Sequence, residues 1–354
     1  MRGLTTAEAR VIQTLIEGGA STEVELIERS GVPRSTFQYV RRRAYGRGWL
    51  YDRYLPSPQL TRASSVTVVL ARPFAERRSR ALRAWTSDPR VVVLWSSANV
   101  SLVVTVDTEA GRRTAFPPIP EAAGQGSRGV SLTAPAAGDM IPVFFDASGA
   151  LSRLFGLRKP QTFPIGFARD GEEAPGRDEA PLSDRRSRYV REFLAATEAE
   201  GGGLLRRSVP PIPWTLPRSE AALVEKGLLR WRVFPRLDRI PPFQGRGAQD
   251  IVFVHGTMTD GCDGREFLRA LAGECGVLPF LLMVGGSAPA KALVGFLALG
   301  GRGAGPGRLA QRSSVQAFLQ ARLKRMTIVR EPLGAMANLV NHRYHDLLSG
   351  GAGG

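Results

Sequence analysis

The sequence feature that most constrains the fold is residues 31–56, which predict a basic helix followed by an aromatic strand. Phe37, Val40 and Ala44 recur at three- to four-residue spacing, so they form one apolar stripe along a helix. Arginines occupy the opposite face, and Gly46 begins the signal that ends the helix. A helix of this kind buries its stripe and leaves a cationic surface.

This cationic surface suits the major groove of DNA. Guanidinium groups bind phosphates and guanine edges, and a glutamine amide can pair with adenine. The predicted groove contacts are Arg34, Ser35, Thr36, Gln38, Tyr39, Arg41 and Arg42, with Arg47 and Arg53 on phosphates from the following strand. Arg43 is expected to face the protein's own backbone or a neighbouring phosphate. The alternative is a surface helix that is basic only because the whole chain is rich in arginine.

Two further helices are predicted before the basic one. The first spans residues 7–18, and the second, capped by Ser21 or Thr22, leads through Gly31 into the basic helix. Three helices followed by a β-wing predict a winged helix-turn-helix domain over residues 1–60.

The run Gly31-Val-Pro-Arg-Ser-Thr36, the helix that it opens and the later Gly48-Trp49-Leu50 resemble the recognition helix and wing of winged helix-turn-helix regulators. The Lrp/AsnC and MarR groups are examples. The resemblance implies a transcriptional regulator of α+β fold class. In the Lrp/AsnC group a ferredoxin-like β-α-β-β-α-β domain follows the winged helix.

The next segment fits that expectation, and we assign residues 64–168 to a ferredoxin-like domain. Strands are predicted at 66–71, 90–95 and 100–106, a helix at 74–85, a loop at 109–137, a strand at 140–145 and a short helix at 151–157. The group usually carries Gly-x-x-Asp between the second and third strands. Ser96-Ser-Ala-Asn99 stands there instead, so a small-molecule effector is left open.

A second copy of this arrangement is predicted after a charged linker at residues 169–182. The pattern Gly-x-Leu-x-x-Arg-x-x-Pro occurs at residues 48–56 and again at residues 227–235. We therefore predict a tandem duplication, with coincidence between divergent sequences as the alternative. Residues 183–240 would form a degenerate second winged helix and residues 248–354 a second ferredoxin-like domain.

Within the second copy, strands are predicted at 251–254, 277–284, 292–299 and 326–329, and helices at 265–272, 315–323 and 336–348. The helix at the place of the second recognition helix carries Glu220 and Glu225. Because phosphates repel carboxylates, we expect a structural or protein-contact role for it.

The net charge points to a polyanionic partner. The chain has 48 lysines and arginines against 32 aspartates and glutamates, a formal charge of +16. Such an excess predicts double-stranded DNA first and an anionic membrane surface second. The apolar region 277–299 is interrupted by a polar, glycine-rich run, so no membrane span is expected and the protein is predicted to be cytoplasmic and nucleoid-associated.

Two motifs raise enzyme chemistry, and neither is complete. His255-Gly-Thr257 follows a predicted strand as in the oxyanion loop of α/β-hydrolases, but the Gly-x-Ser-x-Gly elbow that carries their nucleophile is missing. The glycine-rich residues 300–308 lack the Gly-Lys-Ser/Thr ending of a phosphate-binding loop. The sequence predicts that the protein is not an enzyme and holds no cofactor.

Cys262, Cys275, His342 and His345 offer four possible zinc ligands. The cysteines are thirteen residues apart, whereas paired ligands of a zinc finger lie about two to four apart. We interpret these residues as small core thiols and solvent-facing helix histidines, and expect no metal.

The sequence as a whole favours a sequence-specific double-stranded DNA-binding transcriptional regulator that places its first winged helix in the major groove. Two alternatives stay open: an architectural, nucleoid-type DNA-binding protein and a protein-interaction module, both with little sequence specificity. Self-association through the ferredoxin-like domains is a further expectation.

Overall fold

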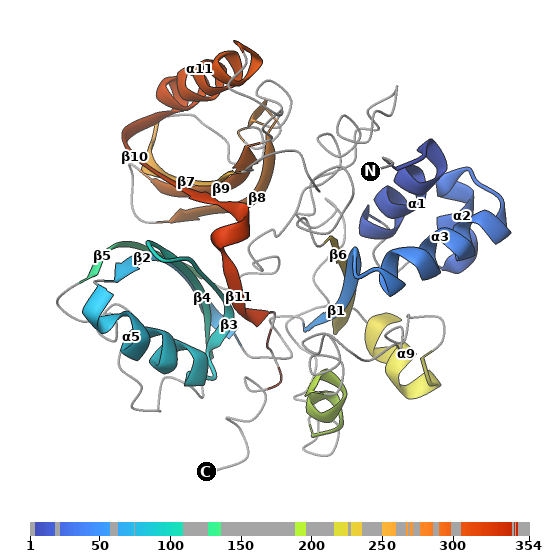
Figure 1. Ribbon diagram of the computed structural model, residues 1–354. Coiled ribbons are helices and arrows are strands. Elements are labelled where there is room, and N and C mark those ends of the chain that lie inside the picture. Colours follow the sequence, from blue (N-terminus) through green and yellow to red (C-terminus); the bar gives the residue numbers. More distant parts are fainter. Residues whose placement is uncertain are drawn as a thin grey trace.

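The computed structural model describes residues 4–17, 22–56, 63–73, 75–108, 127–135, 188–195, 216–225, 228–235, 250–259, 267, 270–271, 277–285, 290–298, 306–341, 343 and 345. These residues form helices and antiparallel sheets, as expected for an α+β fold. Figure 1 shows a helical part near the N-terminus, a two-stranded sheet beside it, and two larger sheets.

The helical part contains α1 (Thr6–Glu17), α2 (Glu23–Ser30) and α3 (Arg34–Gly46), close to the predicted positions. Thr22 caps α2 by accepting a hydrogen bond from the backbone N–H of Glu25 at 3.2 Å. Gly31 ends α2 in the left-handed conformation, with φ of 62°, which glycine adopts without steric cost. Phe37, Val40 and Ala44 form the buried stripe that the sequence predicted.

The strand after α3 does not form a wing hairpin. This strand, β1 (Leu50–Pro56), pairs antiparallel with β6 (Leu229–Pro235), which follows α9 (Arg218–Glu225). In the register of this pair Leu50 lies opposite Pro235, Arg53 opposite Arg232 and Pro56 opposite Leu229. The two copies of the repeated pattern therefore pair in opposite directions, so that the first position of one copy lies opposite the last position of the other. The centre of this strand pair lies between Arg53 and Arg232.

Each strand of this pair also packs against a helix from the other half of the chain. Helix α1 contacts β6, whose Trp231 is fully buried. The helix at residues 188–195 contacts β1, because the Phe193 and Tyr54 rings meet edge to face with centroids 5.0 Å apart. The two halves are interlocked at this point.

The five-stranded sheet contains β2 (Ala63–Pro73), β3 (Val91–Ser96), β4 (Ser101–Thr108), β5 (Ser127–Pro135) and β11 (Ala337–Asn341). Its order is β11-β3-β4-β2-β5. Helix α5 (Ala75–Ser87) covers the outer face, where Trp85 packs with Leu94 and Val340.

The four-stranded sheet contains β7 (Asp250–Met258), β8 (Leu278–Gly285), β9 (Lys291–Ala298) and β10 (Leu323–Pro332), in the order β10-β7-β9-β8. Helix α11 (Pro306–Arg322) covers its outer face through Phe318 and Leu319. Strands β2 to β5 and strands β7 to β10 have the same order within their sheets. In the first set β2 lies between β4 and β5, and in the second set β7 lies between β9 and β10.

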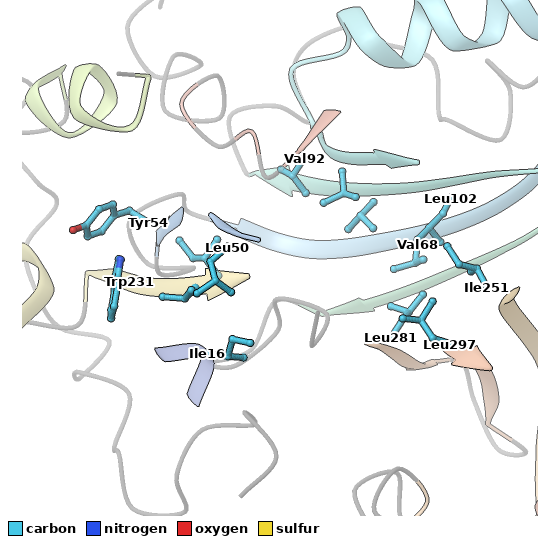
Figure 2. Close-up of a cluster of buried hydrophobic side chains, with 14 of the residues drawn as sticks. Ile16, Leu50, Tyr54, Val68, Val92, Leu102, Trp231, Ile251, Leu281 and Leu297 are labelled. Atoms are coloured by element: carbon cyan, nitrogen blue, oxygen red, sulfur yellow. The ribbon is translucent and has the colours of Figure 1, made fainter. Parts of the chain in front are cut away.

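The inner faces of the two large sheets share one core, with α5 and α11 on the outside (Figure 1). Figure 2 shows Val68 and Leu102 of the first sheet approaching Ile251, Leu281 and Leu297 of the second. A polar contact also joins the sheets: the Asn99 side-chain amide donates to the carboxylate of Glu331 at 3.1 and 3.3 Å. The Glu331 residue is 4% exposed, so Asn99 satisfies a buried charge.

Two elements correct the sequence prediction. The predicted loop at 109–137 contains β5, and the predicted helix at 336–348 begins instead with β11, after the short 3-10 helix Leu333–Ala335. In both places pairing with a distant strand decides the conformation, because β5 joins β2 and β11 joins β3. The predictions for 140–145, 151–157 and the linker at 169–182 fall outside the described residues.

A glycine substitution tests the pairing of β5 with β2. A Cβ at Gly129 would lie 2.8 Å from the carbonyl oxygen of Leu70, so β5 must shift to accept alanine. We expect Gly129→Ala to lower the free energy of unfolding by about 1–3 kcal/mol in urea titrations. The control, Gly46→Ala in α3, meets nothing within 4 Å and should be neutral or slightly stabilising. Equal stability of the two variants would contradict the pairing.

Candidate functional site

Three of the four arginines of α3 form ion pairs with acidic residues of α1 and α2, although the Arg34 side chain stays 70% exposed. Arg41 Nη1 lies 3.0 Å from Glu23 Oε1, and Arg34 Nη2 lies 3.4 Å from the other oxygen of that carboxylate. The Arg41 side chain is 16% exposed. Arg43 pairs with Glu8, whose other oxygen accepts from the backbone N–H of Thr5. Acidic residues of α1 and α2 therefore neutralise much of the predicted cationic surface.

Arg53 lies in the interior of the protein. It is 2% exposed, and its Nη1 donates to the carbonyl oxygen of Asp52 at 3.0 Å. The prediction that Arg53 of a wing contacts phosphate is wrong, because its strand pairs with β6 and is covered. Periodicity missed this burial, since an arginine in an amphipathic strand is ordinarily placed on the solvent face.

The remaining residues that were predicted to contact DNA differ in exposure. Ser35, Tyr39, Arg42 and Arg47 are exposed, whereas Thr36 and Gln38 are half-buried. The Arg47 guanidinium lies 5.4 Å from the centre of the Trp49 ring, a cation–π contact. The structure thus leaves part of the predicted reading face accessible without assembling it into one cationic surface.

A buried polar pair that the sequence did not predict lies on the other side of α3. The Tyr45 hydroxyl donates to Asp52 Oδ1, and Asp52 is 3% exposed. Asp52 lies two residues after Leu50 and two residues before Tyr54, so the three side chains share one face of β1. Leu50 and Tyr54 are buried, so this face is a buried one. That alternation was the available signal, because it places a carboxyl on a buried face.

Burial dominates the chemistry of this pair. Removal from water raises the pKa of Asp52 to about 7, although hydrogen bonding by Tyr45 and Trp231 and the charges of Arg53 and Arg41 act in the opposite direction. Burial and the neighbouring carboxyl also raise the pKa of Tyr45. At neutral pH both forms of Asp52 are therefore populated, as a group that donates and accepts protons requires.

The pair has a connection to the surface. Tyr45 is only partly buried, and Arg41, one helical turn before it, acts on the pair through its charge and is itself paired with Glu23 at the start of α2. We define the buried pair as Tyr45 and Asp52, and the set Glu23, Arg41, Tyr45, Asp52 and Arg53 as the polar network. Strongly shifted pKa values of this kind are concentrated at functional sites.

The other residues that the sequence offered as candidates for catalysis or metal binding do not form a site in the described part of the chain. His255 lies inside β7, so it does not occupy a loop after a strand; burial and nearby Lys291 lower its pKa. Cys262, Cys275 and His342 fall outside the described residues, as do 300–305 of the glycine-rich run. Among the residues that the structure describes, no group of histidine, cysteine and carboxyl side chains has the arrangement of a metal site.

Within the same part of the chain, none of the helices combines the length and the hydrophobicity that a membrane crossing requires.

Two solved structures resemble the chain, whereas no family model and no curated protein matches it. Both are crystal structures of the siroheme decarboxylase NirDL, one in co-complex with an iron-uroporphyrin III analogue. Their TM-scores are 0.46 and 0.48, each at 10% sequence identity. The alignments cover 96% and 97% of this chain, and 97% and 96% of the respective structures.

These findings correct the predicted function. Both similar structures are of a siroheme decarboxylase and neither is of a DNA-binding regulator, so the predictions of a transcriptional regulator, of a protein that is not an enzyme and of double-stranded DNA as the partner are withdrawn. The nucleoid association and the architectural alternative rested on DNA and are withdrawn with it. The comparisons assign no family to this chain, so the resemblance to the Lrp/AsnC group stays a prediction.

The raised pKa of Asp52 predicts a pH-dependent stability. Its carboxyl holds a proton in the folded protein up to about pH 7, whereas the unfolded chain releases it near 3.8. The contribution to stability is therefore fully present below the unfolded pKa and is lost as the pH rises to 7. Between about pH 5 and pH 8, we expect the wild type to lose about 3 kcal/mol of unfolding free energy relative to Asp52→Asn.

Urea unfolding of both proteins across that pH range measures the difference. The control Asp107→Asn leaves the buried pair intact and should follow the wild type. Parallel curves for wild type and Asp52→Asn would show that Asp52 ionises normally.

Proposed function

We propose that the protein is an enzyme that binds a polycarboxylate beside the paired strands β1 and β6 and transfers a proton through Asp52. The observation that carries this proposal is the buried pair, in which Tyr45 donates to a carboxyl whose pKa is about 7. A general acid works best when its pKa lies near the working pH, and burial has brought Asp52 there.

The cations near the buried pair support an anionic ligand. The charges of Arg53 and Arg41 both act on the Asp52 carboxyl, so their positive potential extends to this place. Guanidinium groups bind carboxylates through two parallel hydrogen bonds, and these are stronger where water is excluded. At the backbone level Arg232 lies directly opposite Arg53, which adds a second arginine position at the centre of the pair.

The ligand class follows from charge. A formal charge of +16 favours a polyanion, and with double-stranded DNA withdrawn a molecule that carries several carboxylates is a polyanion of suitable size. Polycarboxylated tetrapyrroles are such molecules. The ligand named for one of the similar structures, an iron-uroporphyrin III analogue, supplies a suitable probe.

Decarboxylation is a reaction that uses a buried proton donor and nearby cations. The bond between the carboxylate and its carbon breaks, carbon dioxide leaves, and the carbon keeps the electron pair and takes a proton. Asp52 supplies that proton, and Tyr45 orients the carboxyl and links it to the surface. No electron acceptor is needed, because the leaving carbon dioxide and the added proton balance the step.

We also infer that the chain is a tandem duplication of a winged helix-turn-helix and a ferredoxin-like domain. The proposed units are residues 1–60, 64–168, 183–240 and 248–354, with a linker at 169–182. The support is that equivalent positions of the repeated pattern exchange places across β1 and β6, and that both large sheets have one strand order. β11 departs from this layout, because it leaves the second unit and joins the first sheet.

The test of the enzymatic proposal is a titration of the full chain with iron-uroporphyrin III. We expect a shift of the porphyrin Soret band that weakens with salt, and loss of carboxyl groups from the porphyrin by mass spectrometry. Asp52→Asn should retain binding and lose about a hundredfold or more in rate, the usual contribution of a general acid.

Asp107→Asn is the matched control, because Asp107 lies on β4 and pairs with Arg90 at 3.7 Å, away from the buried pair. It should bind and react like the wild type. Absence of a spectral shift, or equal rates for Asp52→Asn and the wild type, would overturn the proposal.

A further inference from the structure

A separate hollow of about 220 Å³ lies between the start of α1 and the side of α3 that faces away from the buried pair. Leu4, Ala7, Val40 and Trp49 supply its apolar lining. Trp49 is 3% exposed, so its indole is held in place by the core. The hollow has a fixed apolar wall of the kind that small-molecule sites require.

Two guanidinium groups reach this wall. Arg43 and Arg47 lie 5.6 and 5.4 Å from the centre of the Trp49 ring. Arg43 is held by Glu8, which also lines the hollow. Within the described part of the chain no carboxylate pairs with Arg47, so the hollow carries a net positive charge that is concentrated on this residue.

The size of the hollow limits its occupant. At about 30 Å³ for one water, its volume corresponds to about seven waters, which a single substituted ring fills and a macrocycle does not. Tyr39, which is 58% exposed, stands at the edge and can stack on a flat ligand. An aromatic ring matches the apolar lining, and a carboxylate matches the planar fork of Arg47.

We propose that this hollow binds a small aromatic carboxylate, with its ring against Leu4, Ala7 and Val40 and its carboxylate on the Arg47 guanidinium. Charge-assisted hydrogen bonds in two parallel contacts hold the carboxylate, while Arg43 stays paired with Glu8 at the wall. Thr36 lines the same hollow and offers a hydroxyl. The site is separate from the buried pair and does not depend on the enzymatic proposal.

This site accounts for residues that the sequence analysis had assigned to DNA. Thr36, Tyr39 and Arg47 were predicted to contact the groove or its phosphates, and all three line the hollow. A hydroxyl, an aromatic ring and a guanidinium beside a buried indole form a small-anion site as readily as a nucleic-acid surface. Their convergence on one hollow favours the small anion.

The test is a ligand-observed NMR titration of the full chain with benzoate, benzamide and acetate. Benzamide keeps the ring without the charge, and acetate keeps the charge without the ring. We expect benzoate to bind at least about tenfold more tightly than either, because charge-assisted hydrogen bonds and ring burial both contribute. Equal binding of benzoate and benzamide would overturn the role of Arg47.

Two variants locate the site. Arg47→Gln should weaken benzoate binding about tenfold to a hundredfold, as expected for the loss of a charged hydrogen-bond partner. Arg42→Gln removes an exposed arginine of α3 that does not line the hollow, so it should bind like the wild type. No binding of benzoate, or equal loss in both variants, would overturn the proposal.

Discussion

The pairing of β1 with β6 is the constraint on which the rest of the structure depends. It joins segments from the two halves of the chain, and it places Tyr54 and Trp231 in one core between helices from both halves (Figure 2). Because α1 packs on β6 and residues 188–195 pack on β1, neither half completes its core alone. The large sheets then meet through inner faces that belong to the same apolar cluster.

This pairing also fixes the chemistry of the candidate site. A strand covered on both faces forces Asp52 and Arg53 into the interior, on opposite sides of β1. Burial raises the pKa of Asp52, and hydrogen bonding by Tyr45 and Trp231, together with the charges of Arg53 and Arg41, limits that rise. The same strand on a solvent-exposed wing would leave both side chains hydrated, and the pKa of Asp52 would stay near its ordinary value.

Local pattern in the sequence was enough to predict α1 to α3, α5 and most strands, since their apolar spacing and caps act over a few residues. It was not enough for β5 and β11, whose partners β2 and β3 are distant in the chain. The repeat at 48–56 and 227–235 identified the two segments that meet, but not that they pair with each other. The candidate site depends on that contact, so Asp52 was missed and Arg53 was misplaced.

The prediction of DNA binding took charges from the sequence without the ion pairs that form in the folded protein. The sequence shows acidic residues on α1 and α2 and basic residues on α3, which looks like a helix prepared for phosphate. In the folded protein Glu8 and Glu23 lie next to Arg43 and Arg41 and neutralise them. A net charge of +16 survives this pairing, but its distribution differs: Arg47 lies beside the buried Trp49 and Arg53 lies inside the pair of β1 and β6, so these cations do not form one surface for a double helix.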